Sequence, residues 1–361
     1  MEREFKLLNG DYLKCTQKAA VFTFSAPRTV LSTSALCGGL RQDLTGVFNY
    51  SDCGRAGVCH GMEGRNLREH QHAAALRLGL DPEHTAGLDT AANLDHMVVV
   101  TKQFEDLWIT AAVSAGADVN ALCAGDPAAL TEKSGKPCPV PAGTINIFLL
   151  TGAALSPGAM TELVMTATEA KTAVLRDLMQ GSSVSCELAT GTGTDGICVI
   201  CGREGEELLN GGKHFKLGEL AACAVGEAVR EALFRQTGLC PQQQHSVLAR
   251  LRRFHITEET LRPQGADDSA YRGALRKLDQ DSICMGTVAL YVHLLDERRA
   301  GLLTEAEAGE WADRLLKELG THFQYSFSLP DDLSLPEQLE RFLRELLATH
   351  LRERERLYGG K

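Results

Sequence analysis

Residues 156–201 contain a long helix-like run, a loop of alternating threonine and glycine, and a strand-like run. The apolar residues between Ser156 and Met179 recur at helical spacing, whereas Gly196–Cys201 is a short apolar run typical of a buried strand. The segment between them contains Ala-Thr-Gly-Thr-Gly-Thr-Asp at 189–195. Such a loop presents backbone N–H groups and hydroxyls while filling little volume. It therefore suits close contact with a ligand that is rich in hydrogen-bonding groups.

The same loop contains the string Gly191-Thr-Gly-Thr-Asp-Gly196, which matches the GxGxxG pattern of dinucleotide-binding proteins. In those proteins the string follows a strand and opens a helix, whose N-terminus holds the pyrophosphate. Here the string leads into a strand-like run, so the context is reversed and a nucleotide ligand is disfavoured. The formal net charge of −10 also argues against a large surface that neutralises the phosphates of a nucleic acid.

Two candidate metal-binding patterns are incomplete. Cys198 and Cys201 form a single CxxC pair without the second pair that a metal ribbon needs, and in a strand they would point to opposite faces. His70 and His72 lie in a helix-like run, Asn66–Leu78, where a spacing of two places them on different sides. We expect buried thiols at the cysteines, solvated histidines and no metal held by the protein.

The sequence shows no pattern typical of a membrane-spanning helix or of a secretory signal. No apolar run approaches the ~20 residues of a membrane-spanning helix. The first residues, Met-Glu-Arg-Glu-Phe-Lys, lack the apolar core of a secretory signal. We therefore expect the 12 cysteines to be reduced thiols in a cytoplasmic protein that binds neither a membrane nor a nucleic acid.

The first 245 residues combine short strand-like runs, loops rich in glycine and two long helix-like runs. Asn9-Gly10-Asp11 is a good hairpin turn because Asn and Gly accept a positive φ, so the early strands suit antiparallel pairing. Leu217–Phe234 has the clearest amphipathic helix pattern of the chain. We expect an α+β domain over residues 1–245, with an antiparallel or mixed sheet packed against long helices. A layered α/β sheet is the alternative, because strands and helices alternate from 143 to 234.

After residue 245 helix patterns dominate, charged residues become more frequent and glycines become rare. One amphipathic stripe consists of Leu335, Leu339, Phe342, Leu343, Leu346, Leu347 and Leu351. We expect residues 246–361 to form a separate all-α region. Two roles are open for it: a module for docking a partner or for oligomerisation, or an extension that only stabilises the protein.

Lys171 lies where a lysine is unexpected. On a helical wheel it falls in the middle of an apolar arc formed by Leu163, Val164, Ala167, Val174, Leu175 and Leu178. A lysine on such an arc must be paired, reach outward or lose its proton, because burial of an isolated ammonium group is costly. Lysines of this kind serve as general bases and electrostatic clamps. The structural alternative is an ion pair, with Asp195 at the end of the loop as the candidate partner.

Glu169 has two structural explanations besides a catalytic one. Thr166-Ala-Thr-Glu169 fits a capping box, in which the glutamate bonds back to the helix start. If the helix instead runs continuously from Pro157, Glu169 lies with Glu162 and Arg176 on its polar side. A structural role and acid–base catalysis are both open at this position.

Asn120, Asn146 and Asp195 each end or interrupt a loop of small residues beside a strand-like run. Side chains of this type either cap turns or hydrogen-bond a ligand. For each residue taken alone, turn formation is the simpler explanation.

Taken together, these stretches resemble the adenosylcobinamide amidohydrolase family. The specific part of the resemblance is Thr166-Ala-Thr-Glu-Ala-Lys-Thr172 with Ala189-Thr-Gly-Thr-Gly-Thr-Asp195. The supporting strings are Thr90-Ala-Ala, Ala115-Gly-Ala-Asp-Val-Asn-Ala121, Gly125-Asp126-Pro127, Gly143-Thr-Ile-Asn146 and Lys213-His-Phe-Lys-Leu-Gly-Glu219. The resemblance covers roughly residues 20–237 and implies nothing for the helical region.

The resemblance implies hydrolysis of the amide that joins the aminopropanol arm to the corrin ring of adenosylcobinamide. The product, adenosylcobyric acid, re-enters cobalamin synthesis by this salvage route. The partner is then a small-molecule corrinoid, no cofactor is needed, and cobalt enters only as part of the substrate. A homo-oligomer is compatible with this picture. The alternative is a non-catalytic corrinoid- or small-ligand-binding protein whose helical region docks on a partner.

Amide hydrolysis needs an activated nucleophile, a stabilised oxyanion and a protonated leaving amine. We assign proton transfer to Lys171 and Asp195, with Glu169 as an alternative base, and the oxyanion site to backbone N–H groups near Gly191–Thr194. The residues expected to bind the substrate are Thr90, Asn120, Thr144, Asn146, Thr190, Gly191, Thr192, Gly193 and Thr194. In a rival mechanism, self-cleavage after Gly143 frees Thr144 as a nucleophile with its own amine as base.

Overall fold

The structure is a computed structural model, and it describes residues 2–51, 63–128, 143–330 and 332–358. The chain divides into two compact units. The first comprises the chain up to Val184 and Leu188–Cys240, and the second comprises Ser185–Glu187 and the chain from Pro241 onward.

The first unit is built on one curled, mixed sheet, which has ten strands in the described part of the chain. Its strands are β1 (Arg3–Lys6), β2 (Tyr12–Cys15), β3 (Ala19–Ser32), β4 (Gly39–Ser51), β5 (Thr85–Thr90), β6 (Val98–Phe104), β7 (Leu107–Ala115), β9 (Ile145–Leu155), β11 (Gly196–Gly202) and β12 (Glu207–Leu208). The main path runs β1-β2-β3-β11-β9-β7-β6, while β4 pairs with β3 and β5. Most pairs are antiparallel, but β9 runs parallel to β11 and to β12, and β4 runs parallel to β5. The expected α+β class with a mixed sheet is confirmed.

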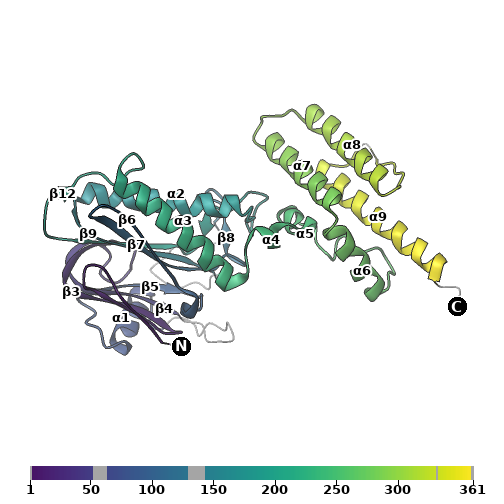
Figure 1. Ribbon diagram of the computed structural model, residues 1–361. Helices are drawn as coiled ribbons and strands as arrows, with labels where there is room; N and C mark the ends of the chain where they lie inside the picture. The colour runs from purple at the N-terminus through teal and green to yellow at the C-terminus, as the bar shows by residue number, and fades with distance from the viewer. Residues whose placement is uncertain (1, 52–62, 129–142, 331, 359–361) are drawn as a thin grey trace. The chain divides into compact units, whose positions relative to one another are not determined.

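Two long helices cover one face of the sheet. Figure 1 shows α2 (Pro157–Asp177) and α3 (Lys216–Thr237) lying over β6, β7 and β9. Alternate residues of β9 and β11, such as Ile147 and Val199, join the core beneath the helices. The residues between them, such as Phe148, join a second core with β3, β4 and β5. The period of two in a strand therefore places each side chain of β9 and β11 in one of two layers.

The two cysteines of the CxxC string follow this alternation. Cys201 belongs to the core under the helices and Cys198 to the core on the opposite side. Burial raises the pKa of both thiols. The expectation of buried thiols on opposite faces is therefore confirmed.

Helix α2 is continuous, so the capping-box interpretation of Glu169 is wrong. The helix starts at Pro157, and the hydroxyl of Ser156 accepts a hydrogen bond from the N–H of Ala159 at 3.1 Å. The hydroxyl of Thr166, the supposed cap, donates to the carbonyl of Gly211 instead. Proline at the first helical position and serine before it outweigh the weaker internal motif.

Helix α1 (Leu67–Arg77) contradicts the expectation that His70 is solvated. His70 is only 2% exposed, and its Nδ1 accepts a hydrogen bond from the N–H of Glu63 at 2.9 Å. The neighbouring Gln71 is also buried and donates to Asp89 on β5 at 2.6 Å. On the same face, Ala74 and Ala75 join a small apolar cluster with Phe48 of β4, so polar and apolar contacts together hold the helix against the sheet.

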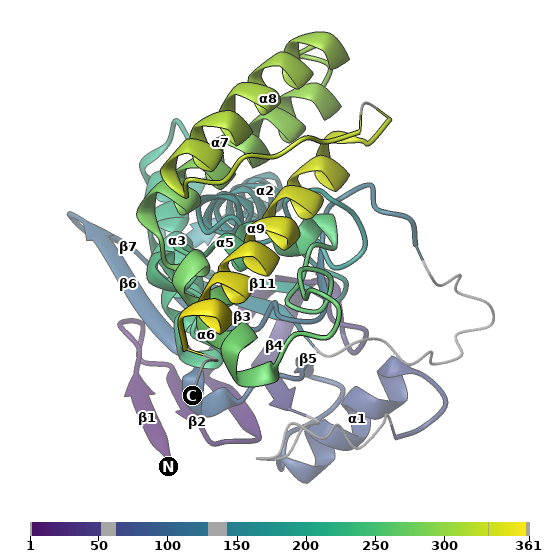
Figure 2. The same ribbon diagram turned by 90° about the vertical axis from the view of Figure 1, so that its right-hand side faces the viewer.

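The second unit is all-α in its described part. Its helices are α4 (Pro241–Gln244), α5 (Val247–Leu251), α6 (Asp268–Asp279), α7 (Ser282–Arg299), α8 (Glu305–His322) and α9 (Leu335–Tyr358). Figure 2 shows α7, α8 and α9 as long neighbouring helices. The predicted stripe from Leu335 to Leu351 is buried in a core of their own. Across the described residues, we find no helix with both the length and the hydropathy to span a bilayer.

Candidate active site

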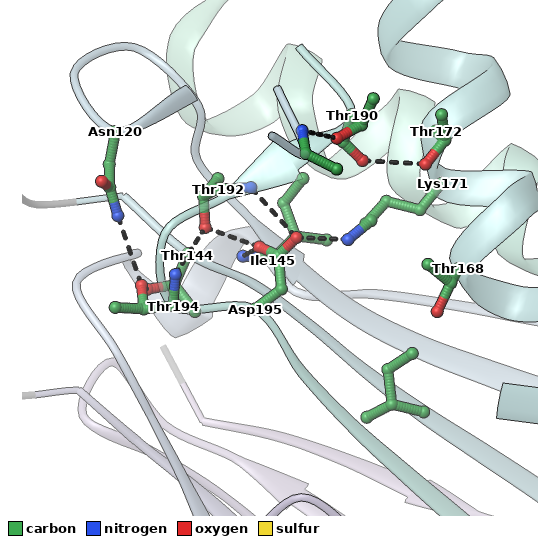
Figure 3. A network of polar contacts seen from close by, with 12 residues as sticks. Asn120, Thr144, Ile145, Thr168, Lys171, Thr172, Thr190, Thr192, Thr194 and Asp195 are labelled. Atoms are coloured by element: carbon green, nitrogen blue, oxygen red, sulfur yellow. Dashed lines mark hydrogen bonds and ion pairs between the residues drawn. The ribbon is translucent and has the colours of Figure 1, made fainter. Parts of the chain in front are cut away.

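The starts of β9 and β11 bring the loops before them together. The two strands are parallel neighbours, with Asn146 opposite Gly196. The residues just before these strands, Thr144 and Asp195, therefore meet at the same edge of the sheet. The short strands β8 (Ala121–Leu122) and β10 (Gly191–Thr192) form a second, two-stranded sheet beside this edge. Figure 3 shows the resulting polar network.

Asp195 is the centre of this network. Its Oδ1 accepts hydrogen bonds from the N–H of Ile145 at 3.0 Å and from the hydroxyl of Thr192 at 2.6 Å. Its Oδ2 accepts from the N–H of Thr192 at 3.0 Å and forms an ion pair with the ammonium group of Lys171. These donors fill the positions at which a carboxylate normally accepts hydrogen bonds. The carboxylate is thus held rigidly beside the lysine.

Lys171 has the partner that its position requires. Its side chain is 8% exposed and that of Asp195 is 13% exposed, so the ion pair is largely shielded from water. Asp195 immediately precedes β11, and the alternation of that strand, extended by one residue, gives it the parity of Ile197 and Val199, which face the helices. Helical spacing in α2 points Lys171 at the sheet, and strand alternation points Asp195 at α2. The sequence therefore dictates that the two charges meet.

Gly191 leaves room for this ion pair. A Cβ atom at this position would lie 2.4 Å from Oδ2 of Asp195 and 2.7 Å from Nζ of Lys171. Any other residue would push the two groups apart, so the loop needs glycine here for close approach rather than for an unusual backbone angle.

A second group of contacts surrounds the carbonyl oxygen of Gly143. This oxygen accepts hydrogen bonds from Nδ2 of Asn120 and from the hydroxyl of Thr194, both at 2.9 Å. The hydroxyls of Thr144 and Thr194 are 2.7 Å apart. Asn120 and Thr144 are buried, whereas Thr194 is exposed.

The N–H groups of Thr192, Gly193 and Thr194, which were expected to form the oxyanion site, already have partners in the loop or in Asn120. The N–H of Thr192 donates to Asp195, and that of Gly193 donates to the carbonyl of Asn120 at 3.2 Å. The N–H of Thr194 is 3.4 Å from the hydroxyl of Thr192. In this arrangement these backbone donors shape the loop, and the side chains of Asn120 and Thr194 are the donors that converge on a carbonyl.

The remaining predicted binding residues lie around this centre in structural roles. The hydroxyl of Thr190 accepts from the N–H of Ala124 at 2.8 Å, and its carbonyl accepts from Thr172 at 2.8 Å. The hydroxyl of Thr90 accepts from the N–H of Ala92 at 3.0 Å. Asn146 points into the opposite layer, where its Nδ2 donates to Asn49 and to the carbonyl of Asp89.

Glu169 lies outside the network. It sits on the exposed side of α2 and forms an ion pair with Lys213. Two positions along a helix correspond to about 200° of rotation, so Glu169 and Lys171 point in different directions. The structure therefore joins Lys171 and Asp195 but leaves Glu169 apart from them.

Sequence reasoning missed a buried polar cluster at the same edge of the sheet. Asn49 donates to Ser114 at 2.8 Å, and His70 lies 3.5 Å from the carboxylate of Asp89. Polar residues at the ends of β4, β5 and β7 were the available signal. Among the described residues, no group of three His, Cys, Asp or Glu side chains could hold a metal ion.

Comparison with known proteins shows the family to which this chain belongs. A family model for adenosylcobinamide amidohydrolase matches residues 4–241, and the chain belongs to this family. It is also 38% identical over 182 residues to an uncharacterized protein of Methanocaldococcus jannaschii, an alignment that covers 47% of this chain and 71% of that relative. The family match supports a hydrolase and includes the whole Lys171–Asp195 network. The helices from α5 onward lie outside it.

Proposed function

We propose that this protein hydrolyses the amide between the aminopropanol arm and the corrin ring of adenosylcobinamide, giving adenosylcobyric acid for cobalamin salvage. The observation that carries the proposal is the buried Lys171–Asp195 ion pair beside the threonine–glycine loop, in a member of this family. A corrin ring carries amides around its rim, which threonine hydroxyls and amide side chains can bind. Cobalt enters as part of the substrate, and the proposal needs no further cofactor.

The reaction adds water across a carbon–nitrogen bond. Water attacks the amide carbon, the bond to the aminopropanol nitrogen breaks, and a proton ends on that nitrogen. Lys171 is the group that carries this proton, because its ammonium group is partly buried beside the loop. Asp195 holds Lys171 in position through the ion pair and is itself held by Ile145 and Thr192.

The exposed loop residues are the ones that would touch the corrinoid. Gly193 and Thr194 are exposed at the tip of the loop, whereas Asn120, Thr144 and Asn146 are buried. The exposed residues would contact the amides of the substrate directly. Asn120, whose side chain bonds to the carbonyl of Gly143 and whose carbonyl accepts the N–H of Gly193, would keep the loop in its binding shape.

The first test is turnover by the purified full-length protein. Incubation with adenosylcobinamide should produce adenosylcobyric acid and aminopropanol, which mass spectrometry separates from the substrate. We expect this turnover because the residues that match the amidohydrolase family include the shielded Lys171–Asp195 ion pair. Tight binding without product would contradict hydrolysis and would support the non-catalytic corrinoid-binding alternative.

A further inference from the structure

We propose that the peptide bond between Gly143 and Thr144 cleaves itself, and that this frees Thr144 as an N-terminal nucleophile. The proposal for the cleavage stands on the geometry around Gly143. The role of the freed residue in hydrolysis rests on the proposed function.

The carbonyl group of the scissile bond is already polarised. Its oxygen accepts two hydrogen bonds of 2.9 Å, from Nδ2 of Asn120 and from the hydroxyl of Thr194. Asn120 follows β7 and Thr194 precedes β11, so distant parts of the chain converge on this one oxygen. Two donors on a carbonyl oxygen stabilise the negative charge that develops there when the carbon is attacked.

The hydroxyl of Thr144 is the adjacent nucleophile. It lies 2.7 Å from the hydroxyl of Thr194. A hydroxyl has one hydrogen, and Thr194 donates its hydrogen to the carbonyl of Gly143, so Thr144 must donate to Thr194. A continuous path for a proton therefore runs from Thr144 through Thr194 to the oxygen of the carbonyl group whose carbon Thr144 would attack.

This path provides the proton transfers that an N-to-O acyl shift requires. Oγ of Thr144 bonds to the carbon of Gly143, and its proton passes through Thr194 to the former carbonyl oxygen. The five-membered ring then opens as the carbon–nitrogen bond breaks, and the proton returns to the nitrogen. The product is an ester between Gly143 and Thr144. Water hydrolyses this ester to the carboxylate of Gly143 and the free hydroxyl and amine of Thr144.

Glycine is required at position 143 for this geometry. Its φ is +136°, and a Cβ atom would lie 2.9 Å from Cβ of Asn120 and 3.2 Å from the carbonyl oxygen of Gly116. A side chain would displace Asn120 from the carbonyl that it polarises.

The freed Thr144 would stay in the candidate active site. Its carbonyl accepts a hydrogen bond from Gly116 at 3.0 Å, and the next N–H, that of Ile145, is bonded to Asp195. Strand β9 pairs with β7 from Ile145 onward and with β11 from Asn146 onward. The fragment that begins at Thr144 would therefore stay paired within the sheet after cleavage. The hydroxyl of Thr144, with its own amine as base, would then replace water in the first step on the substrate amide.

Intact mass and N-terminal sequencing of the purified full-length protein test the cleavage. The wild-type protein should convert with time into two co-purifying fragments, residues 1–143 and 144–361. Thr144→Ala should stay whole, and Thr144→Ser should still cleave because it keeps the hydroxyl. Asn120→Ala should slow cleavage by about 10²–10³-fold, the usual cost of one oxyanion donor. Thr101→Ala is the matched control: it removes a hydroxyl that is 2.8 Å from that of Thr110 on β7, and it should cleave like the wild type.

The outcomes separate this proposal from the proposed function. Wild-type protein that stays whole on long incubation overturns self-cleavage, and if it turns over adenosylcobinamide the proposed function stands. Cleavage without turnover keeps the self-cleavage and contradicts the proposed function. Cleavage at another bond, or cleavage that persists in Thr144→Ala, overturns the proposal.

Discussion

At the scale of single residues, the site depends on the absence of a side chain at Gly191 as well as on the charges of Lys171 and Asp195. Lys171 and Asp195 approach each other over a position that has no side chain, Gly191. The pair is largely shielded, and removal of either charge would leave the other buried without compensation. Lys171 of α2 and the loop residues Gly191 and Asp195 are thus one structural group.

Gly191→Ala tests this group directly. The added methyl would overlap Oδ2 of Asp195 and Nζ of Lys171, so turnover should fall by about 10²-fold or more because a small misplacement of catalytic groups is costly. Turnover is measured with adenosylcobinamide and folding by circular dichroism.

Gly286→Ala provides the control for that change. Gly286 lies in α7 with no neighbouring atom within 4 Å of the added Cβ, so turnover should be unchanged. Wild-type turnover in Gly191→Ala would show that the close approach does not matter.

At the scale of elements, the spacing of residues in helices and strands predicted which way side chains face. It did not predict which strands pair. The apolar arc around Lys171 required a partner, and strand alternation placed Cys198 and Cys201 in different cores, as the structure confirms. The spacing of two placed His70 and His72 on different sides of α1, as observed, but the expectation that His70 is solvated was wrong. The buried face of this helix carries His70 and Gln71 beside Ala74 and Ala75.

The order of the strands in the sheet could not be predicted from the sequence, for a physical reason. β3 pairs with β2, β4 and β11, and β4 continues into a parallel pair with β5. The pairs β3–β11 and β4–β5 join segments that are distant in the chain, so local periodicity carries no information about them. For the same reason, the convergence of Asn120 and Thr194 on Gly143 could not be derived from any one motif.

The start of α2 offers a test at this scale. Ser156→Ala removes the hydroxyl that accepts the N–H of Ala159, and should lower the free energy of unfolding of the first unit by about 1 kcal/mol. Urea denaturation followed by Trp108 fluorescence in a Trp311→Phe background would measure it, because the two tryptophans lie in different units. Ser156→Asp keeps a capping oxygen, so an equal loss in that variant would contradict the role of the cap.

At the scale of the whole molecule, two units have separate hydrophobic cores. The sheet and its helices pack into cores of the first unit, and α5–α9 pack into another. The family match ends at residue 241, close to the point where the first unit ends. The proposed chemistry therefore belongs to the first unit, and partner docking or oligomerisation remains our proposal for the second.

The most direct test of the central claim is a double-mutant cycle of Lys171→Met and Asp195→Asn, with turnover of adenosylcobinamide as the readout. Because the two residues act as one group, each variant should lose about 10²–10⁴-fold in turnover, and the double variant should lose no more than the worse single variant. Corrinoid binding should persist, and the single variants should stay folded with a lower free energy of unfolding, because each leaves one buried charge without its partner. Lys102→Met, which removes a partly exposed lysine paired with Glu227, should match the wild type. Near-wild-type turnover in Lys171→Met, or losses that multiply in the double variant, would contradict the account.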